Sequence, residues 1–283
     1  MRVYIKQLAK VQLFSHICKF LLLFFAYFHF FLYFCTVKTQ IMAIGNVTPD
    51  SFYPSSRLAD TDQIISWARK AISDGAAILD IGACSTRPGS TPVPEEEEWK
   101  RLLPALDILR REMPEAQLSL DTFRPEIARR ALEHFGPMII NDISGGCEEM
   151  YEVVRNFSVP YVWTLKEDLF PCTDAIGKQK ILDNTRDIHE IILDPGIGFR
   201  GGVEQDYACL RLLDQLREYN RPILVGVSRK SMVYKPLGLT PETCLCATQA
   251  LQLYALEHGA TIIRTHDVTA TKQTITLWEK ING

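Results

Sequence analysis

Two cations stand between hydroxyl groups in Ser228-Arg229-Lys230-Ser231, directly after the apolar run at residues 223–227. Such a run is typical of a strand buried on both faces, and the switch to polar residues is abrupt. Cations beyond a strand's carboxyl end could bind a small anion, although an isolated Arg-Lys pair could equally be a solvated strand end. The functional interpretation therefore depends on whether the same construction recurs along the chain.

It recurs, because seven other short apolar runs also end on polar residues. These residues are carboxylates, amides, cations and one histidine: Asp121, Asp194, Asn46, Asn141, Arg87, Arg264 and His266. Carboxylates and amides in a pocket can match the donor and acceptor edge of a flat heterocycle. Arg and His near an Asn could bind a diphosphate with its metal ion.

Four of these residues also have a simpler explanation. Asp121 and Asp194 could cap the helices that follow them, Asn141 could belong to a turn, and His266 could be a structural histidine. None of these explanations predicts polar residues at nearly every strand end together.

The elements that must position these residues alternate regularly. Apolar runs predict eight strands, at residues 41–44, 77–81, 118–120, 138–140, 159–163, 191–193, 223–227 and 261–263. Helices are predicted at residues 62–73, 95–111, 126–133, 205–218, 242–258 and 270–281. Between residues 163 and 191 only 178–186 could be helical, which predicts an abbreviated helix after the fifth strand.

Alternating strands and helices predict a parallel sheet, and eight such units predict a closed (β/α)₈ barrel whose strand ends share one rim. A doubly wound sheet is the alternative architecture. No Gly-x-Gly-x-x-Gly follows the first strand, which weakens a dinucleotide-binding version of it.

Composition limits the possible partners. The chain has 283 residues, is 47% hydrophobic and carries a formal net charge of −3, so we expect no nucleic-acid partner. Its eight cysteines contain no C-x-x-C pair, which favours reduced thiols in the cytoplasm over a zinc site.

Residues 1–40 differ from the rest of the chain. Residues 20–37 are apolar and aromatic, yet the uninterrupted run is shorter than the roughly 20 residues that span a bilayer. Only Lys38, Thr39 and Gln40 separate it from the first strand, and so short a connection disfavours a membrane anchor. We therefore expect an atypical segment at 1–40, a barrel domain at 41–283 and a cytoplasmic protein, with membrane association disfavoured.

The strand-end motifs together resemble the pterin-binding family that contains dihydropteroate synthase. The resemblance begins near Ile41 and rests on seven motifs in order: 46–52 (NVTPDSF), 85–89 (STRPG), 121–122 (DT), 141–143 (NDI), 194–199 (DPGIGF), 228–231 (SRKS) and 264–267 (RTHD). The family fold is a (β/α)₈ barrel, in agreement with the pattern of elements.

The resemblance implies a transferase of folate biosynthesis that joins para-aminobenzoate to 6-hydroxymethyl-7,8-dihydropterin diphosphate and releases diphosphate. The pterin ring would be held by Asp121, Asn141, Asp194 and Lys230. The diphosphate would be held by Asn46, Arg264 and His266, with Asn46 also binding Mg²⁺. Thr86 and Arg87 would lie on a mobile loop, while Phe199 and Ser231 would line the para-aminobenzoate position, where sulfonamides compete. Catalysis would depend on Arg87, Lys230, Arg264 and His266, and family members are commonly homodimers.

The chain departs from the family pattern at several positions. Thr164-Leu165-Lys166 stands where Met-His-Met is usual, and Arg200-Gly201 stands where a Gly-Lys pair is usual. Cys84 occupies a position that is often filled by Glu or by another polar or aromatic residue. Two other functions therefore stay open: a pterin-binding paralogue without catalysis and, ranked last, a methyltetrahydrofolate-dependent methyltransferase. The methyltransferase would have no use for the motif at 85–89.

Overall fold

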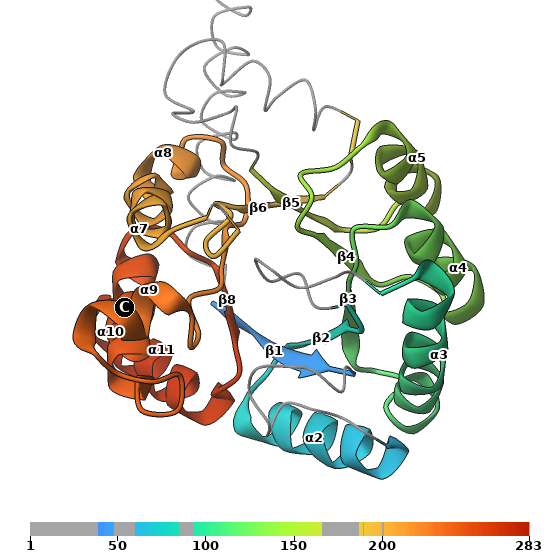
Figure 1. Ribbon diagram of the computed structural model, residues 1–283, viewed down its shortest axis with the longest axis horizontal. Helices are drawn as coiled ribbons and strands as arrows, with labels where there is room; N and C mark the ends of the chain where they lie inside the picture. The colour runs from blue at the N-terminus through green and yellow to red at the C-terminus, as the bar shows by residue number, and fades with distance from the viewer. Residues whose placement is uncertain are drawn as a thin grey trace, which may run out of the picture. The chain divides into compact units, whose positions relative to one another are not determined.

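Eight parallel strands of the computed structural model form one sheet that curves into a barrel (Figure 1). The structure describes residues 39–47, 60–84, 93–165, 187–188, 190–199 and 201–282. The chain divides after Lys38, and all of these residues belong to the second unit, Thr39–Gly283. The apolar stretch at 20–37 and the abbreviated helix predicted at 178–186 lie outside the described residues.

All eight predicted strands are present, within two residues of their expected bounds. They are β1 (Gln40–Asn46), β2 (Ile78–Gly82), β3 (Gln117–Asp121), β4 (Ile139–Asp142), β5 (Tyr161–Thr164), β6 (Ile191–Asp194), β7 (Leu224–Val225) and β8 (Ile262–Thr265). Their order in the sheet is β6-β5-β4-β3-β2-β1-β8-β7. A parallel bridge between Leu193 and Ile223 joins β6 to β7, so the sheet nearly closes on itself. The barrel interpretation is confirmed and the doubly wound alternative is wrong.

Helices pack around the outside of this sheet (Figure 1). They are α2 (Thr61–Asp74), α3 (Glu95–Glu112), α4 (Pro125–Phe135), α5 (Glu148–Phe157), α7 (Val203–Arg211), α8 (Leu213–Arg217), α9 (Ser231–Tyr234), the 3₁₀ turn η3 (Lys235–Leu237), α10 (Leu245–Glu257) and α11 (Val268–Asn282). The sequence prediction omitted α5, although Met150, Val153 and Val154 are buried at helical spacing. It also merged α7 with α8, which the structure separates at Leu212.

Local sequence explains where two of these helices begin and end. The Asp60 carboxylate accepts a hydrogen bond from the Gln63 backbone N–H and caps α2, which ends at Gly75 with a left-handed φ of 111°. Four glutamates fill the first turn of α3, and Arg110 and Arg111 lie in its last turn. Both charge distributions complement the helix dipole.

The two-residue period of the strands arranges the barrel interior in levels. The lower level is a buried aliphatic cluster of inward-facing residues: Met42, Ile78, Ile139, Val162, Ile192, Leu224 and Ile262. Two residues further along the same strands come Ile44, Asp80, Asn141, Thr164, Asp194, Gly226 and Arg264. On five of these seven strands the side chain changes from aliphatic to polar within one period, which leaves an aliphatic barrel floor and places the polar groups at the carboxyl-terminal rim.

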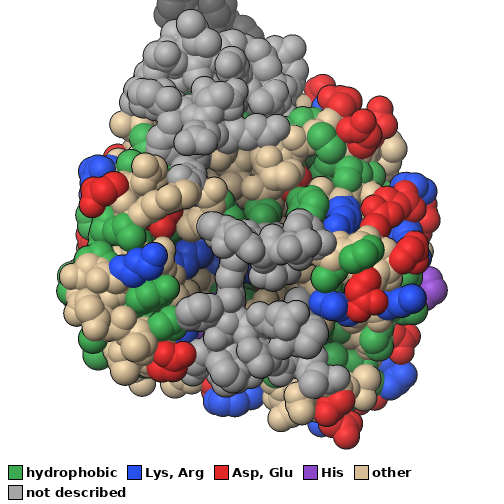
Figure 2. Space-filling model, in the orientation of Figure 1, with side chains coloured by type: hydrophobic (Ala, Val, Ile, Leu, Met, Phe, Trp, Pro, Cys, Tyr) green, Lys and Arg blue, Asp and Glu red, His purple; other side chains and the backbone are tan. Residues whose placement is uncertain are grey.

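The described surface carries both signs of charge. Acidic and basic side chains lie side by side over α3, α4 and α5 (Figure 2), where Arg130 pairs with Glu96 at 2.7 Å. Among the helices whose placement is described, none is long and apolar enough to cross a membrane.

Candidate active site

Arg264 on β8 joins three other polar residues inside the barrel mouth. Its Nε donates to Asp80 Oδ2 and its Nη2 to Asp121 Oδ2, both at 2.7 Å. Asn141 Nδ2 donates to the two carboxylate oxygens of Asp80 at 3.3 and 3.2 Å. Asp80, Asp121, Asn141 and Arg264 are called the inner cluster below. Because these contacts join β2, β3, β4 and β8, strands distant in sequence determine the geometry of this site.

Burial sets the electrostatics of the inner cluster. It raises the pKa of Asp121 to about 7, and the charge of Asp80 acts in the same direction while Arg264 opposes it. Burial alone would lower the pKa of Arg264, but Asp80 and Asp121 raise it, so the guanidinium stays charged. Its third nitrogen, Nη1, makes no hydrogen bond to the residues that the structure describes. That N–H group can therefore donate to a ligand.

Asn141 and Asp142 follow each other on β4 but have different roles. Asp142 accepts hydrogen bonds from the Ser144 backbone N–H and the Tyr161 hydroxyl, both at 2.7 Å, and so shapes the turn and the outer core. Asn141 faces the interior, and its Oδ1 is buried with no hydrogen-bond partner in the described part of the chain. The turn explanation therefore fits Asp142, whereas Asn141 presents a buried acceptor to the barrel mouth.

Lys230 enters the same region from the loop after β7. Its Nζ donates to the Ile197 carbonyl oxygen and lies 4.7 Å from the centroid of the Phe199 ring. Gly198 leaves the space that it occupies, since a Cβ there would come within 2.9 Å of the Lys230 side chain. A Cβ on Gly226 would lie 3.8 Å from Nζ, which is an ordinary contact distance. Burial lowers the pKa of Lys230 to about 8, with Asp194 opposing the shift, so its charge is sensitive to pH near neutrality.

Asp194 and Asp206 shape the turn that Lys230 contacts. Asp194 Oδ1 accepts the Gly196 backbone N–H at 2.8 Å, and Asp206 Oδ1 accepts that of Gly198 at 2.6 Å. Gly198 has a φ of 87°, which glycine adopts without strain. One oxygen of Asp194 thus serves the turn, and neither Asp194 nor Asp121 caps the helix that follows it.

His266 and Asn46 lie at the ends of the neighbouring strands β8 and β1. His266 Nδ1 is 3.1 Å from Ser228 Oγ, which also accepts the His266 backbone N–H at 3.2 Å. The same serine therefore links the end of β7 to the end of β8.

Asn46 is the last residue of β1, and its register partner on β2 is Gly82. A Cβ on Gly82 would lie 3.2 Å from the Asp121 side chain. Gly82 therefore leaves the room in which Asp121 packs.

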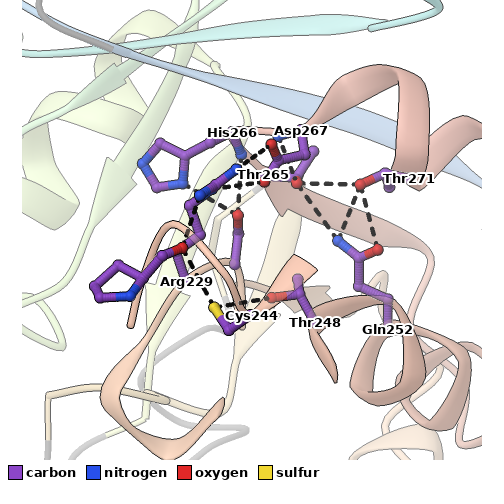
Figure 3. Close-up of polar contacts among 10 residues, drawn as sticks. Arg229, Cys244, Thr248, Gln252, Thr265, His266, Asp267 and Thr271 are labelled. Carbon is purple, nitrogen blue, oxygen red and sulfur yellow. Dashed lines mark hydrogen bonds and ion pairs between the residues drawn. The ribbon is translucent and has the colours of Figure 1, made fainter. Parts of the chain in front are cut away.

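A second polar group lies on the outer side of β8, toward α10 and α11 (Figure 3). Arg229 Nε and Nη2 donate to the two carboxylate oxygens of Asp267 at 2.8 and 2.7 Å, and Nη1 donates to the Pro241 carbonyl at 2.7 Å. Thr271 Oγ1 donates to Thr265 Oγ1 at 3.1 Å and accepts from Gln252 Nε2 at 2.9 Å. Arg229, Asp267, Gln252, Thr265 and Thr271 are called the outer network below.

Arg229 therefore corrects one interpretation of the sequence, which grouped it with cations that could bind an anion. Its side chain is 7% exposed and makes a bidentate pair with Asp267. Its φ of 56° is strained for a residue with a side chain, and such strain persists when surrounding contacts determine the conformation. Arg229 positions the loop that carries Ser228 and Lys230.

The remaining predicted residues divide into two groups. Ser231 begins α9 next to Lys230, and Phe199 contacts the lysine through its ring. Thr86 and Arg87 lie outside the described residues. Sequence reasoning missed Asp80, which is fully buried and contacts both Arg264 and Asn141. An aspartate inside the apolar run 77–81 was the available signal, because a buried carboxylate requires partners.

Comparisons with known proteins identify the family of this chain. Residues 42–266 match the model of the family described as pterin binding enzyme. A dihydropteroate synthase from Synechocystis is 36% identical over 255 residues, which cover 83% of this chain and 88% of the relative.

Solved structures give the same result. The dihydropteroate synthase of Clostridium difficile with pteroic acid has a TM-score of 0.75 and 31% identity, over 86% of this chain and 97% of that one. The enzyme of Xanthomonas albilineans with 4-aminobenzoic acid has a TM-score of 0.76 and 31% identity, over 87% of this chain and 94% of that one. The chain therefore belongs to the pterin-binding enzyme family, and within it to the dihydropteroate synthases, which are transferases.

Proposed function

We propose that the barrel mouth binds 6-hydroxymethyl-7,8-dihydropterin diphosphate and joins it to para-aminobenzoate, with release of diphosphate. The observation that carries this proposal is the buried, unpartnered Asn141 Oδ1 in a cluster that also holds two carboxylates. A pterin ring presents N–H donors and a carbonyl along one edge. Such an edge would satisfy acceptors that the protein leaves open.

Each polar group has a distinct role in this proposal. Asp121, Asp194 and Asn141 Oδ1 would accept the ring N–H groups. Lys230 Nζ has donors besides the one given to Ile197 and would donate to the ring carbonyl. Phe199, beside the Lys230 ammonium, and Ser231 would line the para-aminobenzoate position, where a sulfonamide would compete.

The diphosphate would lie between the ends of β1 and β8. Arg264 Nη1 is the guanidinium nitrogen that Asp80 and Asp121 do not use, and His266 is oriented by Ser228. Donors at these positions would stabilise the charge that develops on the bridging oxygen as the carbon–oxygen bond breaks. The aniline nitrogen then forms the new bond to the methylene carbon and loses a proton, so no side-chain nucleophile is needed.

The oxygen donors at the proposed diphosphate position are compatible with a bound Mg²⁺ ion. The described residues contain no cluster of three His, Cys, Asp or Glu side chains that could hold a metal ion by themselves. Mg²⁺ usually binds through one or two protein oxygens and the phosphates of the substrate, so the Asn46 amide oxygen would be a sufficient protein ligand. When bound, Mg²⁺ supplies additional charge neutralisation on the leaving diphosphate.

The proposed function also includes a loop over the site, the division of the chain, and its compartment and assembly. Thr86 and Arg87 would belong to a loop that covers the bound substrates. Residues 41–283 would form the catalytic barrel, residues 1–40 would be a separate segment, and the protein would act in the cytoplasm as a homodimer.

Diphosphate release from the full chain tests this function, with pterin diphosphate, Mg²⁺ and para-aminobenzoate supplied. We expect release that requires para-aminobenzoate and falls by about 10²–10³-fold in Lys230→Ala, since a buried donor to the ring is lost. Lys235→Ala is the matched control, because Lys235 is an exposed lysine of η3, and it should release diphosphate like the wild type. Pterin binding without release would contradict the proposal and leave a pterin-binding paralogue.

A further inference from the structure

Thr164 ends β5 with a buried hydroxyl group that the roles above do not use. The residue is 2% exposed, and its Oγ1 has no hydrogen-bond partner among the residues that the structure describes. A buried hydroxyl without a partner loses its hydration without compensation. In a native protein such a group requires an explanation, and a functional role or a bound molecule can supply it.

The strand alternation directs Thr164 toward the barrel interior. Val162, two residues earlier, belongs to the aliphatic cluster inside the barrel, whereas Trp163 and Leu165 pack in the core between the sheet and the surrounding helices. Side chains alternate across a strand, so Thr164 faces inward above Val162. It therefore lies on the inner wall at the carboxyl-terminal rim.

Its neighbours on this wall are two residues of the proposed pterin pocket. Thr164 is the register partner of Asp194 on β6, and Asn141 on β4 is the register partner of Val162. Asn141, Thr164 and Asp194 thus lie on three adjacent strands and share the inward face. Two of them, Asn141 through Oδ1 and Thr164 through Oγ1, present buried polar atoms without partners in the described chain.

We propose that Thr164 Oγ1 is a ligand-binding group of this pocket and forms a hydrogen bond with the polar edge of a flat heterocycle, between Asn141 and Asp194. This inference rests on the proposed function, because the heterocycle is the pterin ring. A hydroxyl can both donate and accept, so it pairs with a ring N–H or with a ring carbonyl. The pocket would therefore prefer a heterocycle with a polar atom at this edge over one with an alkyl group there.

Ser119 provides a matched control. Its Oγ is also buried and without a partner in the described chain, and it faces the interior as the register partner of Asp80. Ser119 lies one inward position below Asp121, whereas Thr164 is the last residue of its strand. A ligand at the rim should contact Thr164 and leave Ser119 untouched.

The experiment is a calorimetric titration of the full-length chain with pteroic acid, for the wild type, Thr164→Val, Thr164→Ser and Ser119→Ala. We expect Thr164→Val to raise Kd by about 3- to 10-fold, which is the range for one lost hydrogen bond. Thr164→Ser keeps the hydroxyl and should stay within about 2-fold of the wild type, as should Ser119→Ala. Without ligand, Thr164→Val should melt about 2–4 °C higher, because it removes a buried group that lacks a partner.

Each other outcome has a definite meaning. Wild-type affinity in Thr164→Val, or an equal loss in Ser119→Ala, would overturn the inference and leave the proposed function intact. A lower melting temperature of ligand-free Thr164→Val would also overturn it, since the hydroxyl would then have a structural partner. Wild-type protein that binds no pteroic acid would overturn both the inference and the proposed function.

Discussion

The inner cluster and the outer network lie on opposite faces of β8, one residue apart, and differ in how completely they are paired. Arg264 faces the barrel interior and Thr265 faces α10 and α11. Among the described residues, no buried side-chain polar atom of the outer network lacks a partner, whereas Asn141 Oδ1 in the inner cluster does. Completely paired polar groups make a fold specific, while open ones are available to a ligand.

The ion pairs of the outer network and the inner cluster also differ in how well their charges are balanced. Arg229 and Asp267 form one bidentate pair with matched charge. Arg264 instead lies between two carboxylates, one of which has a pKa raised to about 7 by burial. Groups with shifted pKa values of this kind concentrate at functional sites. The outer network therefore stabilises the fold, and the inner cluster is the group that we propose to bind the ligand.

The largest expected effect is on the outer network. Asp267→Asn should lower the free energy of unfolding by about 3–5 kcal/mol, because it leaves the buried Arg229 guanidinium without its carboxylate. Urea unfolding measures the loss. Asp214→Asn is the matched control on the surface, where its side chain is 59% exposed, and it should change stability by less than about 1 kcal/mol. Wild-type stability of the Asp267→Asn variant would show that the outer network does not stabilise the fold.

The pH dependence of kcat/KM tests the inner cluster and Lys230 together. Asp121 is ionised above its pKa of about 7, and Lys230 is charged below its pKa of about 8. Because the proposed substrate binding needs the Asp121 carboxylate and the Lys230 ammonium, kcat/KM should be bell-shaped. It should fall up to about tenfold per pH unit below 7 and above 8. Lys230→Arg keeps its charge and should abolish the alkaline decline. A decline that persists in this variant would mean that another group titrates there.

Asp80→Asn should have the smallest effect and sharpens the contrast with Asp267→Asn. The negative charge of Asp80 raises the pKa of Asp121, so its removal should move the acidic decline of kcat/KM to lower pH. Stability should fall less than in Asp267→Asn, because Arg264 keeps its ion pair with Asp121. A shift to higher pH, or a larger loss of stability than in Asp267→Asn, would contradict the assignment of the two groups.

The sequence alone was sufficient for the architecture. Eight apolar runs separated by amphipathic segments predicted every strand of the barrel, since a parallel strand buried on both faces leaves a continuous hydrophobic signal. The polar residues that follow these runs also indicated the rim at which the inner cluster lies. Helix boundaries were less accurate, and α5 (Glu148–Phe157) was missed although its apolar residues recur at helical spacing, because a helix of 10 residues repeats that pattern over only about three turns.

Tertiary structure alone decided which of the polar residues face the interior and what they contact. Asp80 looked like part of an apolar strand until the barrel placed it against Arg264, which is 184 positions later in the chain. Arg229 and Lys230 are adjacent cations in the sequence, yet one pairs with Asp267 outside the barrel and the other enters its mouth. Sequence determines the types of residue and their period, whereas partners far apart in the chain meet only when the sheet closes.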